Sequence, residues 1–177
     1  MNGVKISRIS WIETLVLKNS AKEHFSQLTN FVTVVICSLL LILSAKIKVD
    51  LYPVPMTLQP LAVLLIAMLC GRNIAVAAVS LYLFQGMVGI PVFAFGGGLL
   101  YLLGPTGGFL FGFLFASIII GELADREWGK SHLKSVFAMS LGLIVIYTFG
   151  IFQLSVLKGF DWFVRDVKRF LNVFESF

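Results

Sequence analysis

The sequence has almost no charge through its middle. No Asp, Glu, Lys or Arg lies between Arg72 and Glu122, and from residue 31 to residue 121 the only charged residues are Lys46, Lys48, Asp50 and Arg72. Only 13% of the 177 residues are charged, whereas 58% are hydrophobic, and the mean hydropathy is +0.95. A water-soluble domain of this size needs more polar residues to cover its surface. The composition therefore excludes a soluble domain and predicts an integral membrane protein that crosses the bilayer several times.

Histidine and cysteine are scarce as well. His24 and His132 are the only histidines, and both lie in charged segments without a cysteine or carboxylate cluster at metal-ligand spacing. Cys37 and Cys70 lie in apolar segments, where small packing residues are expected rather than a disulfide or a metal site. No nucleophile-base pair is visible. We therefore expect no enzyme activity, no catalytic residue, no metal and no cofactor.

A phosphate-binding loop is lacking too, although residues 124–131, ADREWGKS, end in Gly-Lys-Ser. A Walker A loop needs a glycine at its first position and a preceding strand, but here Ala124 stands first and a membrane segment precedes it. We interpret this stretch as a solvated cytosolic turn. Two readings follow: energy comes from separate ATPase subunits, or the protein works alone by facilitated diffusion.

The apolar segments predict the fold. A cytosolic or interfacial lead-in occupies residues 1–28, and one transmembrane domain occupies residues 29–177. Six crossings are expected, several shorter than the roughly 20 residues of a standard span. Short spans favour loops that dip into the protein, because irregular backbone survives at membrane depth only when protein or water satisfies it. We predict an all-α membrane protein, a compact bundle of six transmembrane helices with re-entrant, glycine-rich outer loops. The six segments are about 29–45, 58–70, 74–85, 107–120, 135–157 and 162–177.

Lysine and arginine counts set the expected orientation. With the N-terminus inside, eight basic residues fall on the inner side and six on the outer side. The excess favours a cytosolic N-terminus and a multi-pass protein in the cytoplasmic membrane. The net charge of +5 fits contact with membrane lipid at the ends of the helices, and no basic patch interleaved with aromatics suggests nucleic acid.

Three unusual segments fall on the outer side of this topology. PVPMTLQP, residues 53–60, brings Thr57 and Gln59 as uncharged donors and acceptors. FDWFVRDVKRF, residues 160–170, brings Asp166 and Arg169, which lie three apart and therefore on one helical face.

The remaining segment, GIPVFAFGGGLLYLLGPTGG, residues 89–108, is apolar yet carries seven glycines. Its glycine backbone, including Gly97, allows close approach to a ligand, and Phe93 and Tyr101 offer apolar walls. Together the three segments predict an outer pocket for a small, partly apolar molecule. The alternative is that all three are ordinary helix ends.

The motifs PVPMTLQ, Leu81-Tyr82-Leu83, GIPVF (residues 89–93) and GPTGG (residues 104–108) resemble the BioY family, the biotin-specific S components of energy-coupling-factor (ECF) vitamin transporters. The resemblance runs from about residue 45 to residue 121. It implies a six-helix substrate-binding protein that captures biotin from outside and takes it up with an ECF transmembrane coupling subunit and ATPase subunits.

The resemblance also implies the site. Thr57 and Gln59 stand in the TLQ motif, and Asp166 with Arg169 match an acid-plus-base pair of the last helix. The family often has an asparagine after PVF, whereas this chain reads AFGGG. Two alternatives therefore stay open: a related vitamin or biotin precursor as the ligand, or a membrane scaffold protein that transports nothing.

Overall fold

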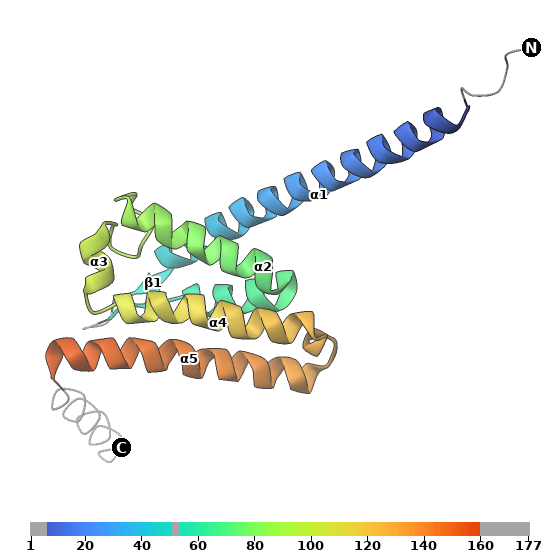
Figure 1. Ribbon diagram of the computed structural model, residues 1–177. Helices are drawn as coiled ribbons and strands as arrows, with labels where there is room; N and C mark the ends of the chain where they lie inside the picture. The colour runs from blue at the N-terminus through green and yellow to red at the C-terminus, as the bar shows by residue number, and fades with distance from the viewer. Residues whose placement is uncertain (1–6, 51–53, 160–177) are drawn as a thin grey trace, which may run out of the picture.

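The computed structural model describes residues 7–50 and 54–159, and the side chains from residue 27 onward. The helix α1, Ser7–Lys46, is 40 residues long and passes residue 28 without a break. Its first half stands clear of the other helices in Figure 1, and its second half joins them. The apolar part of α1, Gln27–Lys46, contains the first predicted span.

A two-stranded antiparallel hairpin follows α1. Strand β1, Lys48–Val49, pairs with β2, Met56–Thr57, so that Lys48 lies opposite Thr57. The hairpin leads directly into α2, Gln59–Met87. A proline in the first turn of a helix loses no hydrogen bond, and Pro60 therefore fits the start of α2.

The helix α2 folds back on itself at Gly71. The backbone there has φ 75° and ψ 179°, a conformation open almost solely to glycine. The two arms of α2 run side by side in Figure 1 and correspond to the predicted segments 58–70 and 74–85. The turn at Gly71 therefore falls between those two predicted segments.

The glycine-rich stretch from residue 89 to residue 108 holds a short helix, α3, Leu99–Leu103. The GPTGG motif follows it directly, and α4, Gly107–Asp125, begins within that motif. A 3-10 turn, η1, Trp128–Lys130, then leads to α5, His132–Lys158. This turn contains Gly129 and Lys130 of the Gly-Lys-Ser sequence, and both are exposed, as expected for a solvated turn.

The helix α4 is the centre of the bundle and packs against α2 on one side and α5 on the other. Small residues allow these close contacts: the Cα of Gly112 faces the backbone of Ile146 in α5, and that of Gly121 faces Arg72 in α2. Ala116 and Ser117 are completely buried between them. Small residues of this kind let membrane helices approach each other closely.

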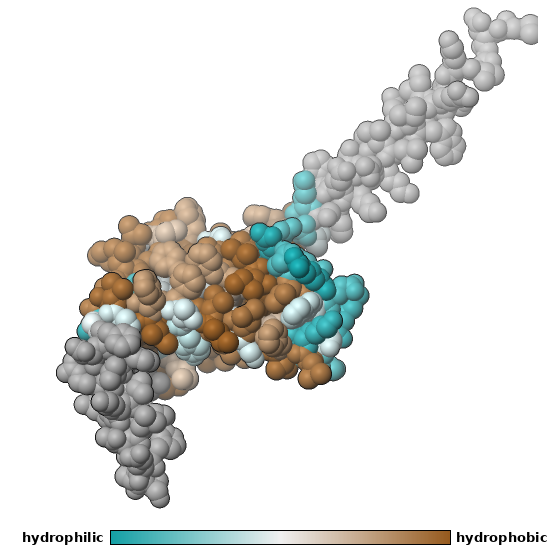
Figure 2. Space-filling view, turned by 60° about the horizontal axis from the view of Figure 1, so that its bottom comes forward, coloured by the Kyte–Doolittle hydropathy of each residue, from teal (hydrophilic) through white to brown (hydrophobic). Residues whose placement is uncertain are grey.

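The outer surface of the bundle is apolar. Four helices are long and apolar enough to cross a membrane, by length and composition, within the ranges that the structure describes. Figure 2 shows hydrophobic side chains over the bundle and hydrophilic ones gathered at one end. Side chains such as Leu69 and Phe152 are 80% and 70% exposed, which suits contact with lipid and not with water. The chain is a multi-pass membrane protein.

Ion pairs close one end of the bundle. Glu122 accepts hydrogen bonds from Arg72 at 3.2 Å and from Arg126 at 3.0 Å, and the Arg72 backbone N–H donates to Asp125 at 3.2 Å. These contacts join the turn of α2 to the end of α4. We call this the turn end, and the opposite end, which carries the β-hairpin and α3, the pocket end.

The prediction of an all-helical membrane fold is thus confirmed, and the two arms of α2 take the places of two predicted segments. The last predicted segment, 162–177, lies outside the described residues. The helices also run further than predicted, to Asp125 in α4 and from His132 in α5. Charged and polar residues at those ends extend the helices beyond their apolar parts.

Candidate functional site

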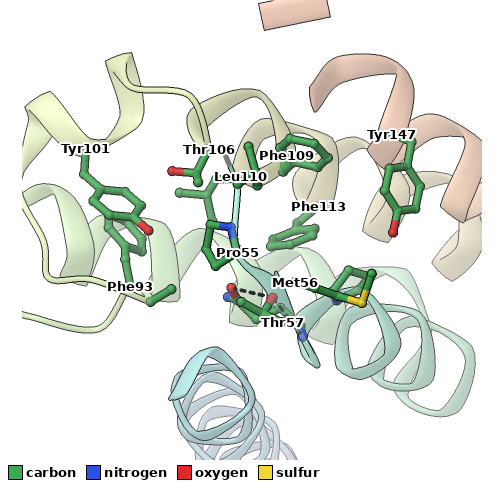
Figure 3. A pocket seen from close by; sticks show the side chains of 14 residues that line it. Pro55, Met56, Thr57, Phe93, Tyr101, Thr106, Phe109, Leu110, Phe113 and Tyr147 are labelled. Carbon is green, nitrogen blue, oxygen red and sulfur yellow. Dashed lines mark hydrogen bonds between the residues drawn. The ribbon is translucent and has the colours of Figure 1, made fainter. Parts of the chain in front are cut away.

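A cavity of about 180 Å³ opens at the pocket end of the bundle (Figure 3). Its wall is formed by the β2 side of the hairpin, the start of α2, the loop before α3, α3 itself, the start of α4 and the middle of α5. The lining residues are Val54, Pro55, Met56, Thr57, Gln59, Pro60, Phe93, Ala94, Tyr101, Thr106, Phe109, Leu110, Phe113 and Tyr147.

The polar side of the cavity is built from Thr57 and Gln59. The Thr57 hydroxyl lies 3.3 Å from Oε1 of Gln59 and accepts the Gln59 backbone N–H at 3.4 Å. Nε2 of Gln59 donates to the Tyr82 hydroxyl at 2.7 Å. These bonds hold the two side chains in one orientation, and a carbonyl or hydroxyl oxygen keeps a second lone pair for a ligand.

An aromatic wall stands beside this polar side. The ring of Phe93 is fully buried and stacks on Tyr101, with ring centroids 4.9 Å apart. The rings of Phe93 and Tyr82 also meet edge to face, with their centroids 5.4 Å apart. The tip of the Phe93 ring points at Gly86, where any side chain would overlap the ring. Phe93 therefore occupies a slot that the second arm of α2 leaves open.

The far wall comes from α4 and α5. Phe109, Leu110 and Phe113 follow one face of α4, and Tyr147 reaches in from α5 opposite Phe93 and Tyr101 (Figure 3). The rings of Phe109 and Tyr147 meet edge to face, with their centroids 5.9 Å apart.

Gln153 fixes the start of α4 beside this wall. Its Nε2 donates to the carbonyls of Leu102 at 3.0 Å and Gly104 at 2.7 Å. A side chain would not fit at Gly107, which faces the Leu102 carbonyl and Gln153, or at Gly108, which faces the backbone of Phe149 in α5. The GPTGG motif thus lets α4 begin in contact with α5.

The cavity is suited to bind rather than to react. Its described lining is aromatic and aliphatic, with hydroxyl and amide groups at Thr57, Gln59, Tyr101, Thr106 and Tyr147, and it contains no ionisable carboxylate or amine. No group of three or more metal-ligating side chains occurs among the residues that the structure describes. Such a wall fits a small molecule with apolar surface and a few hydrogen-bonding groups.

Four of the seven predicted site residues meet at this cavity: Thr57, Gln59, Phe93 and Tyr101. Gly97 is not among the lining residues and lies instead against the Ile90 carbonyl. Asp166 and Arg169 lie outside the described residues.

Sequence reasoning missed the wall made by α4 and α5. Thr106 lies in the GPTGG motif and could have been noticed there. Phe109 and Phe113 are four residues apart, the spacing of one helix face, but aromatic pairs of this kind are common in membrane helices. Tyr147 gave one signal, a hydroxyl in the middle of an apolar segment.

The fold is that of a membrane-embedded S component. The structure superposes on the crystal structure of the S component for biotin from an ECF-type ABC transporter with a TM-score of 0.67, covering 74% of each chain at 23% identity. The chain belongs to the BioY family, whose model matches residues 18–174.

Curated relatives carry the same family name. The biotin transporter BioY of Thermotoga maritima is 38% identical over 135 residues, which are 76% of this chain and 75% of the relative. The probable biotin transporter BioY of Lysinibacillus sphaericus is 39% identical over 112 residues, 63% of this chain and 57% of that relative. These relatives are named as transporters and not as enzymes, in agreement with the sequence.

Proposed function

We propose that this chain captures biotin with high affinity and takes it up across the cytoplasmic membrane as the substrate-specific S component of an ECF transporter. The observation that carries the proposal is the cavity at the pocket end, which brings together the TLQ motif and the aromatic wall in a chain of the BioY family. The first relative, 38% identical, is named a biotin transporter.

The chemistry of biotin matches this lining. Its ureido ring has two N–H donors and one carbonyl, and Thr57 and Gln59 supply oxygens for the donors. Phe93, Tyr101 and Phe113 offer apolar surface to the thioether ring and the valeryl chain. Asp166 would accept a further ureido N–H, and Arg169 would hold the carboxylate or orient Asp166. Gly97 would contribute by shaping the loop beside Phe93.

The proposed topology has six crossings: α1, the two arms of α2, α4, α5 and a last helix over 162–177. The glycine-rich stretch before α4 then forms a re-entrant outer loop over the pocket. The cytosolic N-terminus follows from the lysine and arginine counts. This orientation turns the pocket end outward, where the vitamin is captured, and the turn end toward the cytosol.

Energy for uptake comes from other subunits in this proposal. Gly129 and Lys130 of the Gly-Lys-Ser sequence lie in the turn η1, which follows the helix α4 and not the strand that a Walker A loop needs. We therefore infer a transmembrane coupling subunit and ATPase subunits as partners, in the surrounding lipid. The S component itself binds the vitamin and presents it.

The test is biotin binding by the purified protein in detergent, measured by titration calorimetry and by thermal unfolding. Thr57→Val removes the hydroxyl at nearly constant shape, and we expect affinity to fall on the order of tenfold or more. Asp166→Ala should weaken binding at least as strongly. Thr148→Val is the matched control, because its hydroxyl bonds to the Ile144 carbonyl within α5 and does not line the cavity.

A vitamin panel in the same thermal assay separates the alternatives. Stabilisation by another vitamin or a biotin precursor, but not by biotin, would keep the fold and change the substrate. A folded protein that no small molecule stabilises would contradict the proposal and favour the membrane scaffold.

A further inference from the structure

Lys46 links the end of α1 to the loop that carries Phe93. It is the last residue of α1, and its Nζ donates to the carbonyl of Pro91 at 2.8 Å and to that of Phe93 at 2.8 Å. The charge of the donor strengthens both bonds. The cation also lies at a helix C-terminus, where positive charge is favourable.

These two carbonyls control where the aromatic wall stands. Holding the Phe93 carbonyl fixes the backbone from which the buried ring projects between Tyr82 and Tyr101. The same backbone closes a tight bridge with Gly96, in which the Phe93 N–H donates to the Gly96 carbonyl at 2.8 Å. Lys46 does not line the cavity itself, so it acts through Phe93.

Lys48 contacts the same loop at Phe95. Its Nζ lies 3.2 Å from the centroid of the Phe95 ring and 2.9 Å from the Asp50 carboxylate. Its backbone pairs with Thr57 across the β-hairpin. One short segment after α1 therefore contacts both the loop with Phe93 and the strand with Thr57.

The loop needs such anchors because its own backbone is permissive. Gly89, Gly96 and Gly98 all have positive φ, and glycine loses more conformational freedom on ordering than any other residue. Besides the hydrogen bonds within the loop, one bond ties it to α2: the Gly98 N–H donates to the Gly86 carbonyl at 2.7 Å. The ammonium of Lys46 adds two bonds at the centre of the loop.

We propose that Lys46 is a positioning residue for ligand binding: with Lys48 it holds residues 88–98 in place beside the cavity, keeps Phe93 in the wall and thereby sets how long the ligand stays bound. The inference rests on the proposed function, with biotin as the ligand. Lys46 makes no contact with the ligand and acts by holding two backbone carbonyls.

The first experiment measures the biotin dissociation rate of three variants. Lys46→Met removes the donors and keeps much of the length of the side chain, and we expect dissociation to be roughly tenfold faster. Lys46→Arg keeps a charged donor and should recover most of the residence time. Lys134→Met is the control, since Lys134 lies in the first turn of α5 at the turn end. A Lys46→Met protein with the wild-type dissociation rate would overturn the proposal, and so would Lys46→Arg dissociating as fast as Lys46→Met.

Hydrogen exchange of the ligand-free protein tests the anchor without any ligand. In Lys46→Met the amides of Phe93, Gly96 and Gly98 should exchange faster, whereas α4 and α5 should keep their protection. Unchanged exchange in residues 88–98, or faster exchange throughout the bundle, would overturn the positioning role. If the wild-type protein fails to bind biotin, the proposed function fails, but this measurement still decides whether Lys46 orders the loop.

Discussion

The side-chain amide of Gln59 donates a 2.7 Å hydrogen bond to the hydroxyl of Tyr82, 23 residues later in the same helical element. In an unbroken helix these residues would lie about 34 Å apart, at 1.5 Å per residue. The bond is therefore made only because α2 folds back at Gly71. The bond joins the two arms of α2 beside the cavity, since Gln59 in the first arm lines the cavity and Tyr82 in the second arm packs against Phe93.

Replacing Tyr82 with phenylalanine should destabilise the fold. Tyr82→Phe leaves the buried Gln59 amide without its partner, and an unsatisfied buried donor costs about 1–3 kcal/mol. We expect a lower midpoint of thermal unfolding without ligand, and weaker biotin binding because Gln59 is freed to reorient. Tyr147→Phe is the control, because Tyr147 is 45% exposed and losing its hydroxyl should leave ligand-free stability unchanged. Equal destabilisation by both variants would contradict the role of the Gln59–Tyr82 bond.

Gly86 keeps the slot of Phe93 open. In Gly86→Ala the new methyl group would overlap the Phe93 ring, so we expect the ring to leave the wall and biotin affinity to fall. Gly129→Ala is the control, because a methyl group there would meet only Met68 at an ordinary 3.6 Å.

A double-mutant cycle makes this prediction sharper. Phe93→Ala alone should destabilise the protein by about 3–5 kcal/mol, as expected for a buried aromatic. In the Gly86→Ala background the same change should destabilise it less, because the overlap is already relieved. Additive effects in chemical denaturation would show that Gly86 and Phe93 do not interact.

The turn at Gly71 should tolerate no other residue. Its φ of 75° with ψ of 179° is strained for any side chain, and a methyl group would also meet the Asp125 carboxylate. We expect Gly71→Ala to lower the free energy of unfolding by about 1–3 kcal/mol. Adding Asp125→Ala should restore only part of the lost free energy of unfolding. The second change removes the overlap with the Asp125 carboxylate, whereas the backbone strain at residue 71 remains. Full recovery in the double variant would show that the backbone is not strained.

The two cysteines should form a cross-link under oxidation. The Sγ atoms of Cys37 in α1 and Cys70 in α2 lie 4.0 Å apart, and a shift of roughly 2 Å would bring them to bonding distance. With copper-phenanthroline as oxidant, the thiols lose two protons and two electrons to it and become a disulfide. Mass-tag labelling should then find no free thiol in the monomer, and biotin binding should persist because neither residue lines the cavity. Cys37→Ser should keep one free thiol. Cross-linking between two chains instead would contradict the packing of α1 on α2.

Much of the fold could be predicted because the membrane constrains the composition of each spanning segment separately. A span must be apolar along its length, so the segments near 29–45, 107–120 and 135–157 stood out from composition alone. The break in α2 was equally local, because the glycine is followed by Arg72 and Asn73 in an otherwise apolar run. Four predicted site residues that line the cavity could be picked out from the sequence, because polar or glycine-flanked positions are rare in such a chain: Thr57, Gln59, Phe93 and Tyr101.

The sequence by itself determined the membrane class, the places where helices break, and the segments that bear the unusual residues, since each follows from neighbours along the chain. Only the tertiary structure decided which distant side chains meet. Tyr147 reaches the cavity from α5 because Gly112 lets α4 and α5 approach closely, and Lys46 finds its acceptors 45 and 47 residues away because α1 ends beside the glycine-rich loop. Such contacts depend on helix packing, which hydropathy does not encode because the lipid-facing and the buried faces of a membrane helix are both apolar.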